Sequence, residues 1–406
     1  MSNIEKIYGL KKQWYLNRKE KISDCFFNEF KEYPNFFFSS PGRIEVLGNH
    51  TDHNNGLVMV SAIDLDIFAA VKPRKDNRIV LYSEGYSDKI IVDLNDLEIK
   101  DYEEGKSESL IRGILFKFND LGYKIGGFST SMTSNIFKGS GLSSSAAFEL
   151  LICQILNYLY NDNKIAPIEL AKISQFAENK YFMKPSGLLD QTGISLGGFN
   201  YVDFKDVNNP KVENFSLLLK DYRIVLINTG GSHANLTKNY AAIREDMNKV
   251  AKFFNKEVLR EVSEKEFYNN LYYLKKKVGG RAILRAMHFF EENKRVNEAY
   301  EALKISDVQT FLDKINESGK SSYEMLQNCY IDKDTKQGIA LAYNLGKKWI
   351  KNGAIRVHGG GFKGTVIAYV HVDEQIEFIE KMKNIFGERH VVKVSLRPLG
   401  ASIIEE

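Results

Sequence analysis

Apolar residues along the chain follow the spacing of helices in some segments and of strands in others. Residues 57–71 form a long run rich in Val, Ile and Ala, which is typical of a buried strand. Further strands are expected at 36–40, 78–83, 89–94, 127–133 and 222–228. Helices are expected at 14–32, 107–121, 167–181 and from about 238. The first half of the chain therefore mixes both kinds of element.

The second half of the chain is mostly helical by pattern between residues 244 and 349. Turn signals interrupt it near Gly279-Gly280 and near Gly319. Residues 355–357 and 365–372 predict a hairpin around three consecutive glycines. Because helices and strands do not alternate strictly, the pattern indicates an α+β fold. We place a boundary near residue 205, which divides the chain into domains 1–205 and 206–406.

A glycine-serine loop from Gly139 to Ala147 stands directly before an apolar helical stripe. The stripe consists of Phe148, Leu151, Ile152, Ile155, Leu156 and Leu159. Glycines let the backbone approach a ligand, and a helix start offers unpaired N–H groups, so the loop predicts an anion site for nucleotide phosphates. The alternative is a Gly/Ser linker. No Walker A motif occurs in the chain.

A polar stretch at residues 41–56 concentrates hydrogen-bonding side chains between turn residues. It contains Arg43, Asn49, His50, Asp52 and Asn54. Such groups suit a polyhydroxylated ligand, because a site that bonds each hydroxyl rejects analogues that lack one. The alternative is a polar loop whose side chains cap turns.

Two further stretches carry candidate chemistry. Glu178 lies late on an expected helix, and Asp190 follows a Pro/Gly turn at 185–187. Carboxylates can ligate Mg²⁺ or orient a hydroxyl during phosphoryl transfer. A solvated helix residue and an N-cap are the simpler interpretations. The glycines at 359–361 allow a close backbone approach, although a hairpin tip would also use them.

Composition narrows the class of protein. The chain has 406 residues, of which 43% are hydrophobic, and its 56 basic and 52 acidic side chains nearly cancel. This balance argues against nucleic-acid binding. Three distant cysteines suit a reducing compartment, and no signal peptide or membrane span is seen. We therefore expect a cytoplasmic protein without membrane or nucleic-acid partners, acting as a monomer.

With these four stretches in order, the chain resembles the GHMP kinase superfamily, and within it most closely the galactokinase family. Residues 41–56 are similar to that family's signature, whose usual form is Pro-Gly-Arg-x-Asn-Leu-Ile-Gly-Glu-His-Thr-Asp-Tyr-Asn-x-Gly. The resemblance implies a two-lobed fold, with an N-terminal lobe like ribosomal protein S5 domain 2 and a ferredoxin-like C-terminal lobe. It also implies an ATP- and Mg²⁺-dependent sugar 1-kinase.

The resemblance assigns expected roles to individual residues. Asp190 and Arg43 match the catalytic pair, and Ser145 and Glu178 match the Mg²⁺ ligands. Sugar contacts are expected at Asn49, His50, Asp52, Gly187 and Tyr240. Nucleotide contacts are expected at Gly139, Ser140, Gly141, Leu142, Ser143, Ser144, Ser145, Ser83 and Arg112.

Departures from the family pattern leave the sugar open. Asn49 stands where the family has a glutamate, Glu45 where it has an asparagine, and His53 where it has a tyrosine. Lys363 replaces a usual glycine. Galactose is the first expectation. Because Asn49 is neutral, a uronate such as galacturonate is an alternative, as is an amino sugar. A sugar- and ATP-binding regulator without turnover is a third interpretation.

Overall fold

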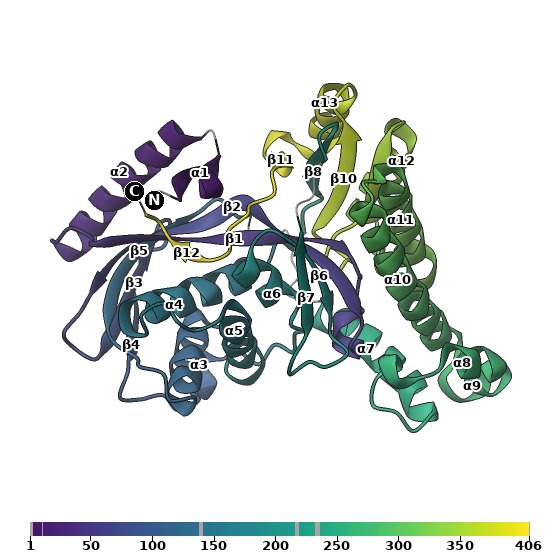
Figure 1. Ribbon diagram of the computed structural model, residues 1–406, viewed down its shortest axis with the longest axis horizontal. Helices are drawn as coiled ribbons and strands as arrows, with labels where there is room; N and C mark the ends of the chain where they lie inside the picture. The colour runs from purple at the N-terminus through teal and green to yellow at the C-terminus, as the bar shows by residue number, and fades with distance from the viewer. Residues whose placement is uncertain (1–2, 10, 138–140, 216–218, 232–235, 406) are drawn as a thin grey trace.

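The computed structural model describes residues 3–9, 11–137, 141–215, 219–231 and 236–405, which form two β-sheets and their covering helices (Figure 1). Within these residues, eight strands form the first sheet and four form the second. The α+β class expected from the sequence is therefore confirmed. No helix in this part of the chain is long and apolar enough to cross a membrane.

The first sheet has the order β12-β1-β2-β5-β3-β4, with β6 paired to β2 and β7 paired to β6. Its strands are β1 (Phe36–Leu47), β2 (Leu57–Pro73), β3 (Arg78–Ser83), β4 (Ile90–Asp93), β5 (Phe128–Ser134), β6 (Phe199–Asp203), β7 (Lys211–Phe215) and β12 (Ser402–Ile403). The long strand β2 pairs with β6 along its first part and with β5 along its last. The sheet therefore divides at the middle of β2.

Helices cover both faces of the first sheet (Figure 1). On one face lie α1 (Ile4–Tyr8) and α2 (Lys12–Phe30), and on the other lie α3 (Ser107–Asp120), α4 (Ser144–Tyr160), α5 (Pro167–Lys180) and α6 (Leu189–Leu196). Helix α2 packs Ile22 and Phe26 with Phe68 of β2. Helix α4 is buried along most of its length, as its apolar stripe predicts.

The second sheet has the order β11-β8-β10-β9 and is antiparallel throughout. Its strands are β8 (Tyr222–Asn228), β9 (Gly353–Val357), β10 (Thr365–His371) and β11 (Val391–Val394). Two helices, α12 (Gly338–Trp349) and α13 (Gln375–Phe386), pack on one face of this sheet. This strand order, with two helices on one face, is that of the ferredoxin-like lobe expected from the resemblance.

The remaining helices connect the two sheets. They are α7 (Thr237–Phe253), α8 (Glu264–Asn269), α9 (Leu271–Val278), α10 (Gly280–Lys304) and α11 (Val308–Ser321). Residues of α10 and α11, such as Val296 and Leu312, share one apolar core with Ile44 of the first sheet and Ile367 of the second. The site described below lies where these two sheets meet.

Two local expectations were wrong. The strand expected at 36–40 continues to Leu47, because register shifts beside Arg43 and Glu45 let it pass Pro41 and stay paired with β2. Gly319 does not mark a turn and lies inside α11. A Cβ at that position would lie 2.7 Å from the carbonyl oxygen of Ile355, so glycine there permits close helix–strand packing.

The boundary near residue 205 stays a prediction. Strand β7, which follows residue 205, still pairs with β6 of the first sheet. Strand β12, near the C-terminus, pairs with β1 of the same sheet. The segments on either side of the boundary therefore interleave.

Asp66 ties both ends of the chain to the first sheet, and its replacement tests this tie. Tyr8 donates a hydrogen bond to Asp66 at 2.9 Å, and Arg18 and Arg397 both pair with the buried carboxylate. Because Asp66→Asn leaves these cations without a counter-charge, we expect unfolding free energy to fall by about 3 kcal/mol.

Urea unfolding at pH 7 measures this loss. Asp162→Asn is the matched control, since its ion pair with Lys164 is exposed, with 81% and 78% of the two side chains accessible. The control should change stability by less than about 0.5 kcal/mol. Equal stability of the Asp66 variant and the wild type would contradict the expected tie.

Candidate active site

Arg43 lies at the centre of the site and contacts three of the predicted stretches. Its Nε and Nη2 atoms lie 2.8 and 2.7 Å from Oδ1 of Asp190. Its Nη1 atom donates to the carbonyl oxygen of Gly141 at 2.6 Å. A Cβ on Gly359 would lie 3.9 Å from Arg43 Nη2, so the glycines of the β9–β10 turn adjoin the same point. Segments far apart in sequence thus meet around one guanidinium.

Local backbone geometry positions the partners of Arg43. Asp190 stands in the first turn of α6, where a helix favours negative charge. Ser143 precedes α4 in the left-handed conformation, with φ of 59°, and its hydroxyl donates to Oδ2 of Asp190. The carboxylate of Asp190 therefore receives hydrogen bonds on both oxygens.

These contacts set the charge of Asp190. Burial by itself would raise its pKa, but the Arg43 guanidinium and the Ser143 hydroxyl outweigh burial and lower the pKa below the usual value. Asp190 is therefore a carboxylate at neutral pH, able to accept a hydrogen bond or a proton.

Ser145 and Glu178, the expected Mg²⁺ ligands, lie beside each other. The Ser145 hydroxyl is 3.3 Å from Oε1 of Glu178, and Gln191 donates to Oε2 at 2.8 Å. Lys184 pairs with Oε1 at 2.6 Å, through a side chain that is 55% exposed. A hydroxyl and a carboxylate fit the oxygen preference of Mg²⁺. The described residues contain no group of three or more His, Cys, Asp or Glu that could hold a metal.

Asn49, an expected sugar contact, is hydrogen-bonded to other residues of the protein. Its side chain is fully buried, and its Nδ2 donates to Glu45 at 2.9 Å and to the Gly359 carbonyl at 2.7 Å. Its Oδ1 accepts from Asn328 at 2.8 Å and from Ser322 at 3.3 Å. Because an amide has two donors and two acceptor lone pairs, this capacity is used completely. These hydrogen bonds link β1 of the first sheet to the β9–β10 turn of the second, and the sugar contact expected for Asn49 stays a prediction.

Glu45 supplies the carboxylate that Asn49 lacks. Its Oε1 pairs with Arg356 of β9 at 2.6 Å, and both side chains are buried. Sequence reasoning noted Glu45 only as a departure and missed Arg356. A charged residue within an otherwise apolar strand was the available signal for Arg356.

Four other expected sugar-contacting positions are Gly187, Asp52, His50 and Tyr240, of which Asp52 is close enough to Asp190 to be repelled by it. A Cβ on Gly187 would lie 1.8 Å from Oδ2 of Asp52, so only glycine allows this approach. His50 is already paired through both ring nitrogens, with Gly360 at 3.0 Å and His53 at 3.3 Å. Tyr240 donates to the Gly361 carbonyl at 3.1 Å.

The expected nucleotide-binding residues divide into three groups. Gly139 and Ser140 lie outside the described residues. Gly141, Leu142, Ser143, Ser144 and Ser145 run from the loop into α4 beside Arg43. Ser83 ends β3.

Arg112, an expected nucleotide contact, lies in α3. It is buried and forms a bidentate pair with Glu103 at 2.9 and 2.8 Å. Its guanidinium holds Glu103 beside the start of α3, and the nucleotide contact expected for Arg112 stays a prediction.

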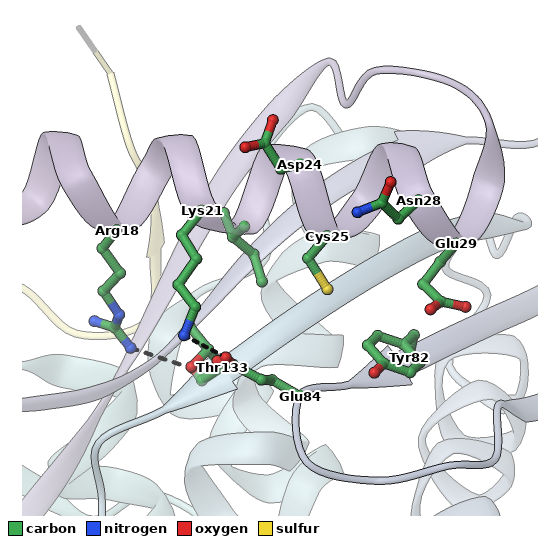
Figure 2. Close-up of a pocket in the computed structure, with 10 residues that line it drawn as sticks. Arg18, Lys21, Asp24, Cys25, Asn28, Glu29, Tyr82, Glu84 and Thr133 are labelled. Carbon is green, nitrogen blue, oxygen red and sulfur yellow. Dashed lines mark hydrogen bonds and ion pairs between the residues drawn. The ribbon is translucent and has the colours of Figure 1, made fainter.

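A groove of about 460 Å³ lies away from this site, between α2 and the ends of β3 and β5 (Figure 2). Arg18, Lys21, Cys25, Tyr82 and Glu84 are among its lining residues. Figure 2 shows Lys21 reaching Glu84 and Arg18 reaching Thr133. Because α2 covers the face of the sheet opposite α4 and α6, this groove does not adjoin Asp190.

Comparisons with known proteins agree with the geometry. The galactokinase galactose-binding signature matches residues 24–73, and the GHMP kinases N-terminal domain matches residues 109–198. Curated relatives are galactokinases of Clostridium tetani, 32% identical over 87% of this chain and 88% of the relative, and of Limosilactobacillus reuteri, 32% identical over 89% and 92%.

Solved structures of related kinases are also similar to this chain. Lactococcus lactis galactokinase complexed with galactose superimposes with a TM-score of 0.82 at 27% identity, covering 94% of this chain and 98% of that one. Methanococcus jannaschii mevalonate kinase is similar in fold alone, with a TM-score of 0.63 at 15% identity over 89% of this chain and 98% of that one.

The charge of Asp52 affects stability, and pH tests this effect. Burial, with repulsion from Asp190 and Glu45, raises the pKa of Asp52 to about 6. The folded state therefore binds a proton that the unfolded state has released, and stability falls as pH rises from about 4 to 6.

Asp52→Asn removes this titration. We expect the variant to be more stable than the wild type at pH 8, by up to about 3 kcal/mol, and to lose the advantage near pH 4. Urea unfolding of both proteins at the two pH values measures it. A variant no more stable than the wild type at pH 8 would exclude the raised pKa.

Proposed function

The chain belongs to the galactokinase family of the GHMP kinase superfamily, and is a phosphotransferase that acts on a sugar hydroxyl; we propose that ATP, Mg²⁺ and galactose are its ligands and galactose 1-phosphate its product. The observation that carries this proposal is the contact of Asp190 with Arg43 and Ser143 at the edge of the glycine-serine loop. It joins an ionised carboxylate, a fixed cation and a phosphate-binding backbone.

Each group has a distinct part in the proposed transfer. Asp190 accepts the proton of the anomeric hydroxyl, whose oxygen forms a bond to the γ-phosphorus of ATP. The bond from that phosphorus to the β–γ bridging oxygen breaks, and ADP leaves. Arg43 holds Asp190 and places positive charge beside the reacting oxygens. Catalysis then rests on positioning and charge stabilisation.

Ser145 and Glu178 would hold Mg²⁺ in this proposal. When bound, the ion neutralises charge on the nucleotide phosphates. Lys184 shares Glu178 with the proposed ion, and its exposed side chain can turn away from the carboxylate. Gln191 fixes the other oxygen of Glu178.

The charges at the sugar end favour a neutral substrate. The neutral side chain of Asn49 suggested a uronate substrate, but the carboxylate of Glu45 lies directly beside Asn49. Glu45 and Asp190 are both close enough to Asp52 to raise its pKa by repulsion. A uronate carboxylate would meet these like charges, whereas galactose would not.

The proposal also includes a monomer in the cytoplasm. Cys25, Cys153 and Cys329 are all free thiols, which supports a reducing compartment.

A sugar panel tests the substrate. ADP release is measured with the purified protein, Mg·ATP and galactose, galacturonate, galactosamine or glucose. We expect the highest kcat/KM with galactose and no detectable turnover with galacturonate. Turnover of galacturonate in preference to galactose would overturn the substrate proposal, and no turnover with any sugar would favour a non-catalytic regulator.

Removal of the Asp190 charge tests the chemistry. Because a neutral amide cannot take the hydroxyl proton, we expect Asp190→Asn to lower kcat about 10³-fold while nucleotide affinity changes by less than about threefold. Coupled ADP release and calorimetric binding of ADP measure the two effects. Asp162→Asn, on the exposed surface, is the control and should retain wild-type turnover. Substantial turnover by Asp190→Asn would remove Asp190 from this role.

A further inference from the structure

His358 carries a hydrogen-bond donor that the mechanism above does not use. It follows β9 in the turn that leads to β10, and its side chain is 1% exposed. Its Nε2 lies 3.0 Å from the backbone nitrogen of Glu45. A backbone N–H can only donate, so Nε2 accepts, and the proton of the neutral ring is on Nδ1.

The ring is neutral because of its surroundings. Burial, reinforced by the cations Arg43 and Arg356, holds the pKa of His358 well below its usual value. The Nδ1–H group is therefore a neutral donor in a fixed tautomer. Among the described residues it has no hydrogen-bond partner. A buried donor without a partner is unfavourable for folding, so its presence points to a ligand.

The position of Nδ1 indicates which ligand atom would reach it. Gly141 has φ of +74°, and a Cβ at that position would have His358 Nδ1, at 4.0 Å, as its nearest described neighbour. The buried Nδ1 atom therefore lies beside Gly141, on the side where a side chain would stand. The same Gly141 accepts from Arg43, which holds Asp190. The Nδ1–H donor is thus near the proposed reacting centre and beside the glycine-serine loop.

We propose that His358 is a further catalytic residue, whose Nδ1–H donates to a non-bridging oxygen of the γ-phosphoryl group as that group passes Gly141. This inference rests on the proposed kinase function and adds to it a contact on the transferred group. The contact forms no covalent bond and moves no proton. It stabilises charge on the equatorial oxygens during transfer.

The tautomer of His358 excludes the role of a general base, which is the other common role of a histidine. Nε2 is occupied by the Glu45 N–H, and Nδ1 carries the proton, so the ring has no lone pair to offer a substrate. His358 cannot act as a base while this hydrogen bond holds. Donation from Nδ1–H is therefore the role that this geometry allows.

Two substitutions separate the donor from the structural contact. His358→Gln can still accept from the Glu45 N–H with its amide oxygen, but it has no donor at the Nδ1 position. His358→Asn places an amide N–H near Nδ1 and loses the contact to Glu45. We expect His358→Gln to lower kcat about 10²-fold with little change in the sugar KM, and His358→Asn to retain at least tenfold more activity than His358→Gln.

The order of activity of His358→Gln and His358→Asn decides the proposal. If His358 only holds β1 through Glu45, His358→Gln is the more active variant, and this order overturns the proposal. Equal activity of the two variants also overturns it. Thermal unfolding of each variant shows that activity is compared between folded proteins.

Nucleotide binding makes the test independent of the sugar. Calorimetry compares the affinity for ADP with that for a non-hydrolysable ATP analogue, each with Mg²⁺. We expect His358→Gln to weaken the triphosphate about tenfold and to leave ADP unchanged. Wild-type binding without turnover on any sugar would defeat the kinase proposal alone. An unchanged preference for the triphosphate in His358→Gln would defeat the role of His358 alone.

Discussion

The buried ion pair between Glu45 and Arg356 fixes the two sheets relative to each other, and the active site depends on that placement. Glu45 belongs to β1 of the first sheet and Arg356 to β9 of the second. Their 2.6 Å contact is supplemented by a hydrogen bond from Arg356 to the carbonyl oxygen of Val46 at 2.8 Å. Removal of one partner of a buried pair leaves an unpaired charge, so the pair holds only while both remain.

The ion pair acts on the candidate site through β1, the strand that carries both Glu45 and Arg43. Arg43 and Glu45 are two residues apart on one strand and therefore lie on the same face. Arg43 reaches Asp190 and the glycine-serine loop, while Glu45 reaches Arg356 and presents its N–H to His358. The proposed reacting groups come from several distant segments, and all of them contact this one strand. This arrangement brings the carboxylates of Asp190 and Glu45 close to Asp52, and their repulsion contributes to its raised pKa.

Sequence patterns predicted elements well where the periodicity is long and apolar. The run at 57–71 and the stripe after residue 147 appear as β2 and α4. The contact between Arg43 and Asp190 spans 147 positions, and only the resemblance to a family paired the two residues. The paired state of Asn49 could not be predicted, because its partners Ser322 and Asn328 lie more than 270 positions away in the sequence. Local patterns carry no information on such partners.

The exchange of asparagine and glutamate illustrates this limit. The family signature has asparagine at the position of residue 45 and glutamate at the position of residue 49, whereas this chain has Glu45 and Asn49. Considered singly, Asn49 suggests a lost charge and a different sugar. In the fold the two side chains touch at 2.9 Å, so the exchange moves one carboxylate a short distance and ties it to Arg356. The local charge is preserved, and the departure by itself does not require a charged substrate.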